Sequence, residues 1–85
     1  MRQLYFFHAP WCPPCRFFEK QFISPLASMA GQDKIVRIDV QKEPFRADRY
    51  GVSRVPMAIL MEGGKAVDYV GMADLERCAQ FLKGE

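Results

Sequence analysis

Two cysteines separated by two residues, Cys12 and Cys15, are the side chains of this sequence best suited to chemistry. On a helical turn, positions three apart place their Cβ atoms about 5 to 6 Å apart, within reach of a disulfide. An apolar run ends a few residues before Cys12, and helical spacing begins at Cys15. The pair is therefore expected where a strand passes into a helix, and it predicts either redox chemistry or half of a metal site.

The two cysteines are expected to play different roles. Cys12 should lie at the helix N-terminus, where unpaired N–H groups and the helix dipole stabilise a thiolate, so we expect its pKa to fall below the free value of about 8.5. Pro13 and Pro14 suit the first turn but carry no N–H, which leaves the Cys15 N–H as the main donor to the Cys12 sulfur. Cys15 should be less exposed and less acidic. Cys12 is therefore the expected attacking thiolate, and Cys15 the resolving thiol.

Length and composition narrow the possible functions. Eighty-five residues, of which 49% are hydrophobic, predict a single domain over residues 1–85 with one packed core. The net charge is +2 and basic residues alternate with acidic ones, so we expect neither nucleic acid nor a membrane as a partner. Met1-Arg2-Gln3 leads directly into an apolar run without the features of a signal peptide. We therefore expect a cytoplasmic protein, and a monomer.

Apolar runs and helical spacing alternate along the chain. Gln3 to His8 is too apolar for a half-exposed strand, so we expect a central strand covered on both faces. A helical crossover from Pro14 to Gly31 would make the next strand parallel to it. The expected strands cover residues 3–8, 34–40, 57–61 and 66–70, with a hairpin turn at 62–65, and the expected helices begin at Pro14, Pro44 and Asp74. The order β-α-β-α-β-β-α predicts an α/β fold with a four-stranded mixed sheet flanked by three helices.

Three positions within the helices carry further expectations. Ser24-Pro25 interrupts the first helix: either the proline kinks it, or a new helix begins there with Ser24 as its N-cap. Asp74 is expected to cap the last helix. Cys78 lies on the apolar face of that helix, so we expect it to behave as a small buried hydrophobe, with a regulatory thiol as the alternative.

The motif Trp11-Cys12-Pro13-Pro14-Cys15 resembles the active site of thioredoxins, and Val55-Pro56 ahead of the third strand resembles the cis-proline loop of that family. Val70-Gly71 is similar to the valine-glycine that thioredoxins place beside the dithiol. The resemblance spans nearly the whole chain and implies a minimal thioredoxin fold. Thioredoxins usually carry an extra strand and helix at the N-terminus, so the length is closer to that of glutaredoxins.

The resemblance also implies a docking surface for substrates. If Pro56 is cis, the backbone of Val55 would lie beside the dithiol and could pair with an extended stretch of the substrate. Exposed apolar residues around the dithiol would suit transient contact with several disulfide-bearing proteins. The expected docking residues are Trp11, Pro13, Val55, Pro56, Gly71 and Met72.

The sequence departs from the thioredoxin pattern beneath the second cysteine. Thioredoxins commonly have a buried Asp six residues before the first cysteine, and a Lys from the following strand near it. We interpret Phe6 and Ile35 as the matching positions, so that apolar groups would replace both charges. Cys15 would then lack a buried proton acceptor, and we expect slower resolution of the mixed disulfide or the use of another base.

His8 and Arg54 are candidate modulators of the Cys12 pKa. His8 stands four residues before Cys12, where thioredoxins often have Trp, and Arg54 stands just before the Val-Pro pair, where a small residue is frequent. A cation that reached the dithiol would lower the pKa of Cys12 further. The alternatives are a strand-end histidine without such a role and a solvated arginine.

The leading hypothesis is a protein dithiol-disulfide oxidoreductase that acts through a mixed disulfide on Cys12 and takes part in electron transport and cell redox homeostasis. No nucleotide-binding Gly-rich motif is present, so electrons must arrive from outside, and the resemblance implies a flavin-dependent thioredoxin reductase as the donor. We expect no metal or organic cofactor, because the dithiol is itself the redox centre.

Three alternatives remain open. A glutaredoxin-like enzyme reduced by glutathione is favoured by the short length and by the segment from Gly71 to Leu75, which resembles part of a glutathione site, but Trp11, Pro14 and Ala9 argue against it. A metal-binding module would need two more ligands, such as His8 and Cys78. A non-catalytic binding domain would use the fold only as a platform.

Overall fold

The computed structural model describes residues 1–84, and its four strands form one mixed sheet. The strand order is β2-β1-β3-β4, with β1 and β2 parallel and with β3 antiparallel to both β1 and β4. The strands are β1 (Arg2–His8), β2 (Ile35–Asp39), β3 (Met57–Glu62) and β4 (Lys65–Val70). The expected four-stranded mixed sheet is confirmed.

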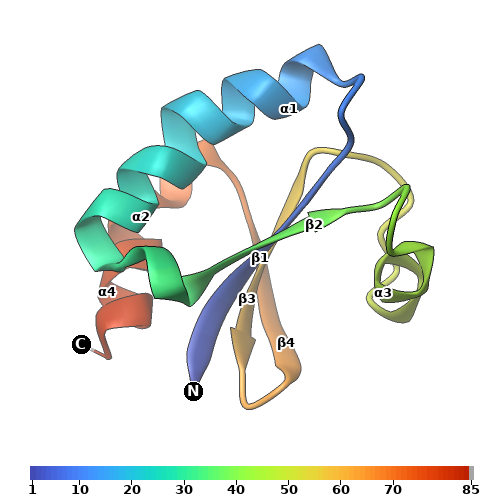
Figure 1. Ribbon diagram of the computed structural model, residues 1–85. Coiled ribbons are helices and arrows are strands. Elements are labelled where there is room, and N and C mark those ends of the chain that lie inside the picture. Colours follow the sequence, from blue (N-terminus) through green and yellow to red (C-terminus); the bar gives the residue numbers. More distant parts are fainter. Residues whose placement is uncertain (85) are drawn as a thin grey trace.

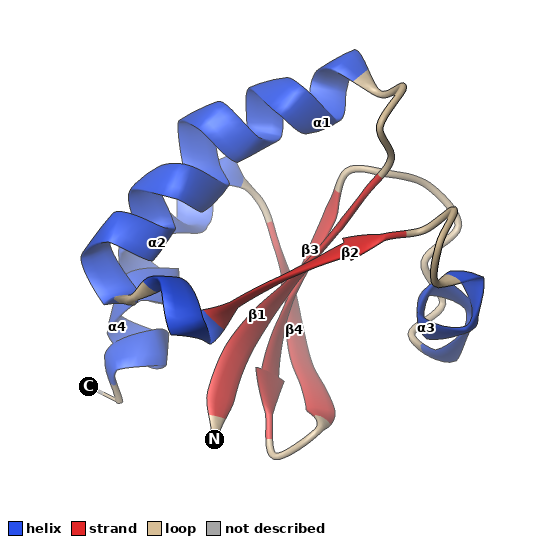
Figure 2. Cartoon of the chain, in the orientation of Figure 1, coloured by secondary structure: helices blue, strands red, loops and turns tan. Residues whose placement is uncertain are grey.

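Helices cover both faces of this sheet (Figure 1). A long first helix comprises α1 (Pro13–Phe18), a π-helical turn (Glu19–Ile23) and α2 (Ser24–Ala30), and it is followed by α3 (Pro44–Arg49) and α4 (Leu75–Lys83). The long helix and α4 lie on one side of the sheet, and α3 lies on the other (Figure 2). No helix within residues 1–84 is long and apolar enough to cross a membrane.

The first helix continues through Pro25. Ile23 and Ser24 keep helical backbone angles, and the Ser24 N–H donates to the Glu19 carbonyl, five residues back. This wide turn precedes the proline, which cannot donate to the preceding turn. The Ser24 hydroxyl donates to the Glu19 carboxylate at 2.6 Å and caps no helix end. The N-cap alternative is therefore wrong.

Asp74 also has a different partner from the one expected. Its carboxylate accepts the Gly71 N–H at 2.8 Å, so it closes the 3₁₀ turn Met72–Asp74 and makes no hydrogen bond to the first turn of α4. The cap expected from the sequence is placed one turn too late, because the 3₁₀ turn precedes the α-helix.

The sheet separates two apolar cores because side chains alternate along β1. Leu4 and Phe6 point to the side of α2 and α4, and Phe7 points to the side of α3. Burying each of these side chains stabilises the fold by about 1.5 to 3 kcal/mol. The first core includes Phe18, Phe22, Ile23, Leu26, Leu60, Cys78 and Leu82, and the second includes Ile38, Ala47, Val52, Ile59 and Met61.

One edge of the sheet collects the segments that carry the candidate site. The carboxyl ends of β1, β2 and β4 and the amino end of β3 share this edge, because Phe7 is registered with both Ile38 and Met57, and Ala58 is registered with Val70. At the opposite edge a tight turn joins β3 to β4, with positive φ angles of 59° and 83° at Gly63 and Gly64, as two-residue hairpins require.

Candidate redox site

Cys12 and Cys15 form a disulfide at the start of α1, with their Cα atoms 5.2 Å apart. Cys12 is the N-cap residue and has an extended backbone, with φ −102° and ψ 100°. The loop before it is short, because the Cys12 N–H donates back to the Ala9 carbonyl at 3.3 Å. The strand therefore passes almost directly into the helix, as the cysteine spacing predicts.

The Cys15 N–H donates to the Cys12 sulfur at 3.1 Å. This is the donor expected from the sequence, since Pro13 and Pro14 have none to offer. Both cysteines are buried to the same extent, with 3% of each residue exposed. The expected difference in exposure is absent because the disulfide holds both sulfurs in one turn.

The expected docking residues lie at the edge of the sheet from which this turn begins. The Val55–Pro56 peptide bond is cis, as expected. Trp11 is 64% exposed, and together with Val55 it lines an apolar groove of about 390 Å³. Pro13 is exposed and adjoins Cys12, Pro56 is half-buried, and Gly71 and Met72 follow the end of β4 at the same edge of the sheet.

The groove contains residues that the sequence analysis missed. Val40, Val52, Ser53 and Arg54 complete its lining. Val40 directly follows β2 at the edge of the sheet, and this position is the signal that could have identified it. Arg54 is exposed and joins the docking groove, and no hydrogen bond links it to either cysteine.

His8, the last residue of β1, lies outside the docking groove. Its ring stacks on Phe6, with 5.3 Å between ring centroids and 26° between ring planes. It lines a second hollow of about 210 Å³ together with Cys15. Of the two cysteines, Cys15 is the one that lines this hollow with His8.

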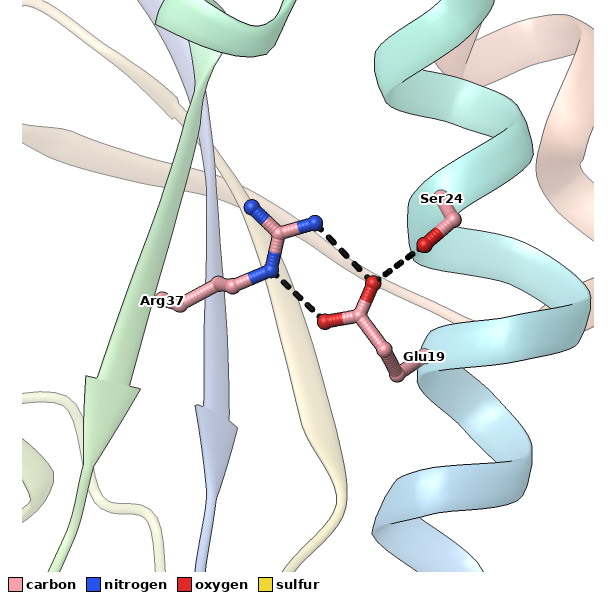
Figure 3. Close-up of polar contacts among 3 residues, drawn as sticks. All are labelled: Glu19, Ser24 and Arg37. Carbon is pink, nitrogen blue, oxygen red and sulfur yellow. Dashed lines mark hydrogen bonds and ion pairs between the residues drawn. The ribbon is translucent and has the colours of Figure 1, made fainter.

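A carboxylate from the long helix reaches β2 beside this hollow (Figure 3). Arg37 donates from Nε and one terminal nitrogen to the two Glu19 carboxylate oxygens, at 2.6 and 2.9 Å. The hydrogen bonds from Arg37, and to a lesser extent that from Ser24, lower the pKa of the Glu19 carboxyl against the opposing effect of burial. The Glu19 carboxylate in turn raises the pKa of Arg37.

The strand register shows which residue of β2 lies beside Phe6. Phe6 is paired with Arg37, whereas Ile35 is paired with Leu4. Ile35 is apolar, as the sequence analysis notes, but Arg37, two residues further along the same face of β2, is the residue registered with Phe6. Position 6 is apolar as expected, but its neighbour on β2 is a cation whose partner, Glu19, comes from the helix.

Cys78 is fully buried on the face of α4 that packs into the first core. Burial raises the pKa of its thiol to about 11. The expectation of a small buried hydrophobe is confirmed. Across residues 1–84, no group of three or more histidine, cysteine or acidic side chains could hold a metal ion.

A four-stranded mixed sheet, a disulfide-forming pair at the start of the first helix and a cis-proline before β3 define a thioredoxin-type fold and site. The Thioredoxin family model matches residues 2–84, so the chain belongs to the thioredoxin family.

Individual relatives agree with this assignment. The chain is 33% identical over 78 residues to mitochondrial thioredoxin of Bos taurus, covering 91% of this chain and 47% of that protein. It is 33% identical over 81 residues to a thioredoxin of Staphylococcus aureus, covering 94% and 78%. It thus spans about half the length of the mammalian relatives.

Solved structures give the same result. The X-ray structure of Fasciola hepatica thioredoxin superposes with a TM-score of 0.80 at 25% identity, covering 96% of this chain and 81% of that one. The N21Q mutant thioredoxin from Halobacterium salinarum superposes with a TM-score of 0.71 at 30% identity, covering 98% and 73%.

Proposed function

We propose that this protein is a thiol-disulfide oxidoreductase that reduces disulfides of other proteins. The observation that carries the proposal is the Cys12–Cys15 pair at the N-terminus of a long helix, in a chain of the thioredoxin family. The pair needs no metal or organic cofactor, because two thiols supply the two electrons and two protons that reduce one disulfide.

The reaction proceeds in two exchanges. The Cys12 thiolate attacks one sulfur of the substrate disulfide, a mixed disulfide forms and one substrate thiolate leaves. The Cys15 thiolate then attacks the Cys12 sulfur, which releases the second substrate thiolate and forms the Cys12–Cys15 disulfide. The substrate gains two electrons and the protein loses them.

The groove between Trp11 and Val55 is the proposed docking surface for substrates. Its lining is mainly apolar and includes Trp11, the residue before Cys12. The exposed Trp11 ring offers the large, rigid contact typical of binding hot spots. Pro13, Pro56, Gly71 and Met72 extend the proposed surface along the same edge of the sheet.

A flavin-dependent thioredoxin reductase is the proposed electron donor. The glutathione alternative relied on the segment from Gly71 to Leu75. In the structure the Asp74 carboxylate already accepts the Gly71 N–H at 2.8 Å and pairs with Arg77 at 3.1 Å, so it is occupied by its own chain. This favours the reductase.

We also propose that the protein is a single-domain monomer that acts in the cytoplasm in cell redox homeostasis. The relatives include mitochondrial and chloroplastic thioredoxins as well as bacterial ones.

Reduction of insulin disulfides, measured with thioredoxin reductase and in parallel with glutathione, tests the proposal. Turnover is expected with the reductase and not with glutathione. Cys12→Ser should abolish activity, and Cys15→Ser should trap a covalent adduct with the substrate. A Cys12→Ser protein that still reduces insulin would contradict the assigned roles.

A further inference from the structure

Cys15 must lose its thiol proton before it can attack the mixed disulfide, because the thiolate is the nucleophile. The core behind it offers no acceptor: within residues 1–84 no polar or charged side chain is buried, and Phe6 and Phe18 belong to the same apolar cluster as Cys15. The proton therefore has to leave toward solvent.

The hollow on the His8 side is the route that the structure provides. It is lined by Phe6, His8, Ala9, Pro10, Cys15, Arg16 and Glu19. Its volume of about 210 Å³ exceeds the roughly 30 Å³ that one water occupies in the liquid, so water can connect Cys15 to the polar groups at the rim. The docking groove does not provide such a route for the proton, because Cys15 is not among the described residues that line it.

Besides Cys15, three charged or titratable residues line this hollow, and two of them are poor proton acceptors. Arg16 is a permanent cation, and it donates to the Pro10 carbonyl at 3.2 Å. The Glu19 carboxylate holds three donor contacts from Arg37 and Ser24, which lower the pKa of its carboxyl and leave it a weak base.

His8 is the third group, and its ring is held in place with its edge free. The face of the imidazole stacks on Phe6, and no described residue forms a hydrogen bond with its ring nitrogens. An imidazole is the side chain suited to exchanging protons near neutral pH. The charged groups that face it are Arg16 and Glu19 from the long helix, and Arg37 and Asp39 from β2.

We propose that His8 accepts the proton of Cys15 through water in this hollow and that Glu19, held by Arg37, compensates the charge of the imidazolium formed. The inference rests on the proposed function. The Cys15 S–H bond breaks, an N–H bond forms on His8, and the Cys15 thiolate attacks the Cys12 sulfur. The Cys12–substrate bond breaks as the Cys12–Cys15 bond forms, and the departing substrate thiolate takes the proton back from His8.

A small chromogenic aromatic disulfide, mixed with excess reduced protein in a stopped-flow instrument, tests the proposal. The first thiolate is released when Cys12 attacks, and the second when Cys15 resolves the mixed disulfide. His8→Phe keeps a ring against Phe6 but cannot accept a proton. We expect its first phase to match the wild type within about twofold, and its second phase to be about 10- to 100-fold slower near neutral pH.

Two further variants separate proton transfer from packing. His8→Ala should show the same slow second phase, and added imidazole should restore part of the rate in proportion to its unprotonated fraction. Tyr50→Phe, which also removes a titratable group from a ring but on the α3 side of the sheet, should leave both phases unchanged.

The pH profile provides the decisive readout. In the wild type the second-phase rate should reach a plateau as the pH rises, whereas in His8→Phe it should keep rising with hydroxide concentration. Second-phase rates and pH profiles that agree within about twofold among all variants would overturn the inference alone. Loss of the first phase from the wild type would overturn the proposed function and the inference with it.

Discussion

Few groups are available to stabilise the Cys12 thiolate. Pro13 and Pro14 remove two backbone donors from the first turn, so the Cys15 N–H at 3.1 Å is the hydrogen bond that its sulfur receives. The helix that begins here runs without a break to Ala30, and its positive end adds to the stabilisation of an anion. A thiolate at this position therefore rests on one hydrogen bond and the helix dipole.

Trp11→Ala should impair the reduction of protein disulfides. The ring is 64% exposed at the docking groove, and losing such a contact is expected to lower kcat/KM for insulin about tenfold, or about 1.4 kcal/mol. A small aromatic disulfide, which does not fill the groove, should react at the wild-type rate. Phe45→Ala, which removes an exposed aromatic ring from α3, is the matched control and should change neither rate. Equal insulin kinetics in all three proteins would contradict the docking surface.

The Glu19–Arg37 ion pair joins the long helix to β2, and Glu19 also lines the hollow on the His8 side. Because the pKa of Glu19 is lowered from its ordinary value of 4.5, its contribution to stability is complete above that value and is lost as the pH falls through the lowered pKa. The pair is about one-third exposed, which keeps its contribution small.

Glu19→Gln should lower the free energy of unfolding by about 0.5 to 1 kcal/mol at neutral pH, and by progressively less in acid, where the wild-type carboxylate is also protonated. Urea unfolding at several pH values measures this difference. Glu76→Gln, on an exposed glutamate of α4 that forms no ion pair within residues 1–84, is the control and should show no such loss. A pH-independent difference between Glu19→Gln and the wild type would contradict this account of the ion pair.

Gly31 ends the long helix with φ 114° and ψ 135°, a conformation almost restricted to glycine. A Cβ there would also approach the Asp33 carboxylate oxygen to 2.7 Å. Gly31→Ala should therefore destabilise the protein by about 1 to 3 kcal/mol in thermal unfolding. Gly71→Ala, at an ordinary φ and with nothing within 4 Å of the added carbon, should cost much less. Equal losses would contradict the backbone explanation.

Local patterns predicted the elements well and their partners less well. The strand at residues 57–61 and the turn at Gly63-Gly64 follow from apolar spacing and turn chemistry, and the structure has them. Ser24 and Asp74 have the residue types of helix caps, but each bonds elsewhere. Such a side chain lies close to several possible hydrogen-bond partners, and the spacing in sequence does not show which of them it will bind.

The pairing of residues between β1 and β2, and the contacts that depend on it, could not be predicted from the sequence. The CxxC motif and the Val55–Pro56 pair identified the dithiol and its edge of the sheet, because each depends on neighbours in sequence. The pairing of Phe6 with Arg37, and hence the role of Glu19, depends on how β1 and β2 align across a crossover of more than twenty residues. A shift of two residues keeps every apolar side chain on its face, so composition does not reveal it.

Packing of the core makes the thiol of the third cysteine, Cys78, unreactive in the folded protein. Burial raises the pKa of Cys78 to about 11. After reduction of the Cys12–Cys15 disulfide, the folded protein should therefore react with iodoacetamide at Cys12 and leave Cys78 unmodified at mildly alkaline pH, as mass spectrometry of peptides would show. In denaturant all three cysteines should be labelled. Labelling of Cys78 in the folded protein at the rate of Cys12 would contradict the core assignment.

The pH dependence of alkylation of the reduced protein, followed separately at Cys12 and Cys15, tests the central claim most directly. The account predicts that Cys12 reacts as a thiolate with a pKa below the free value of about 8.5, and that Cys15 becomes reactive only at higher pH. Two cysteines that titrate together near the free value would show that the helix N-terminus does not activate Cys12, and would contradict the proposed enzyme.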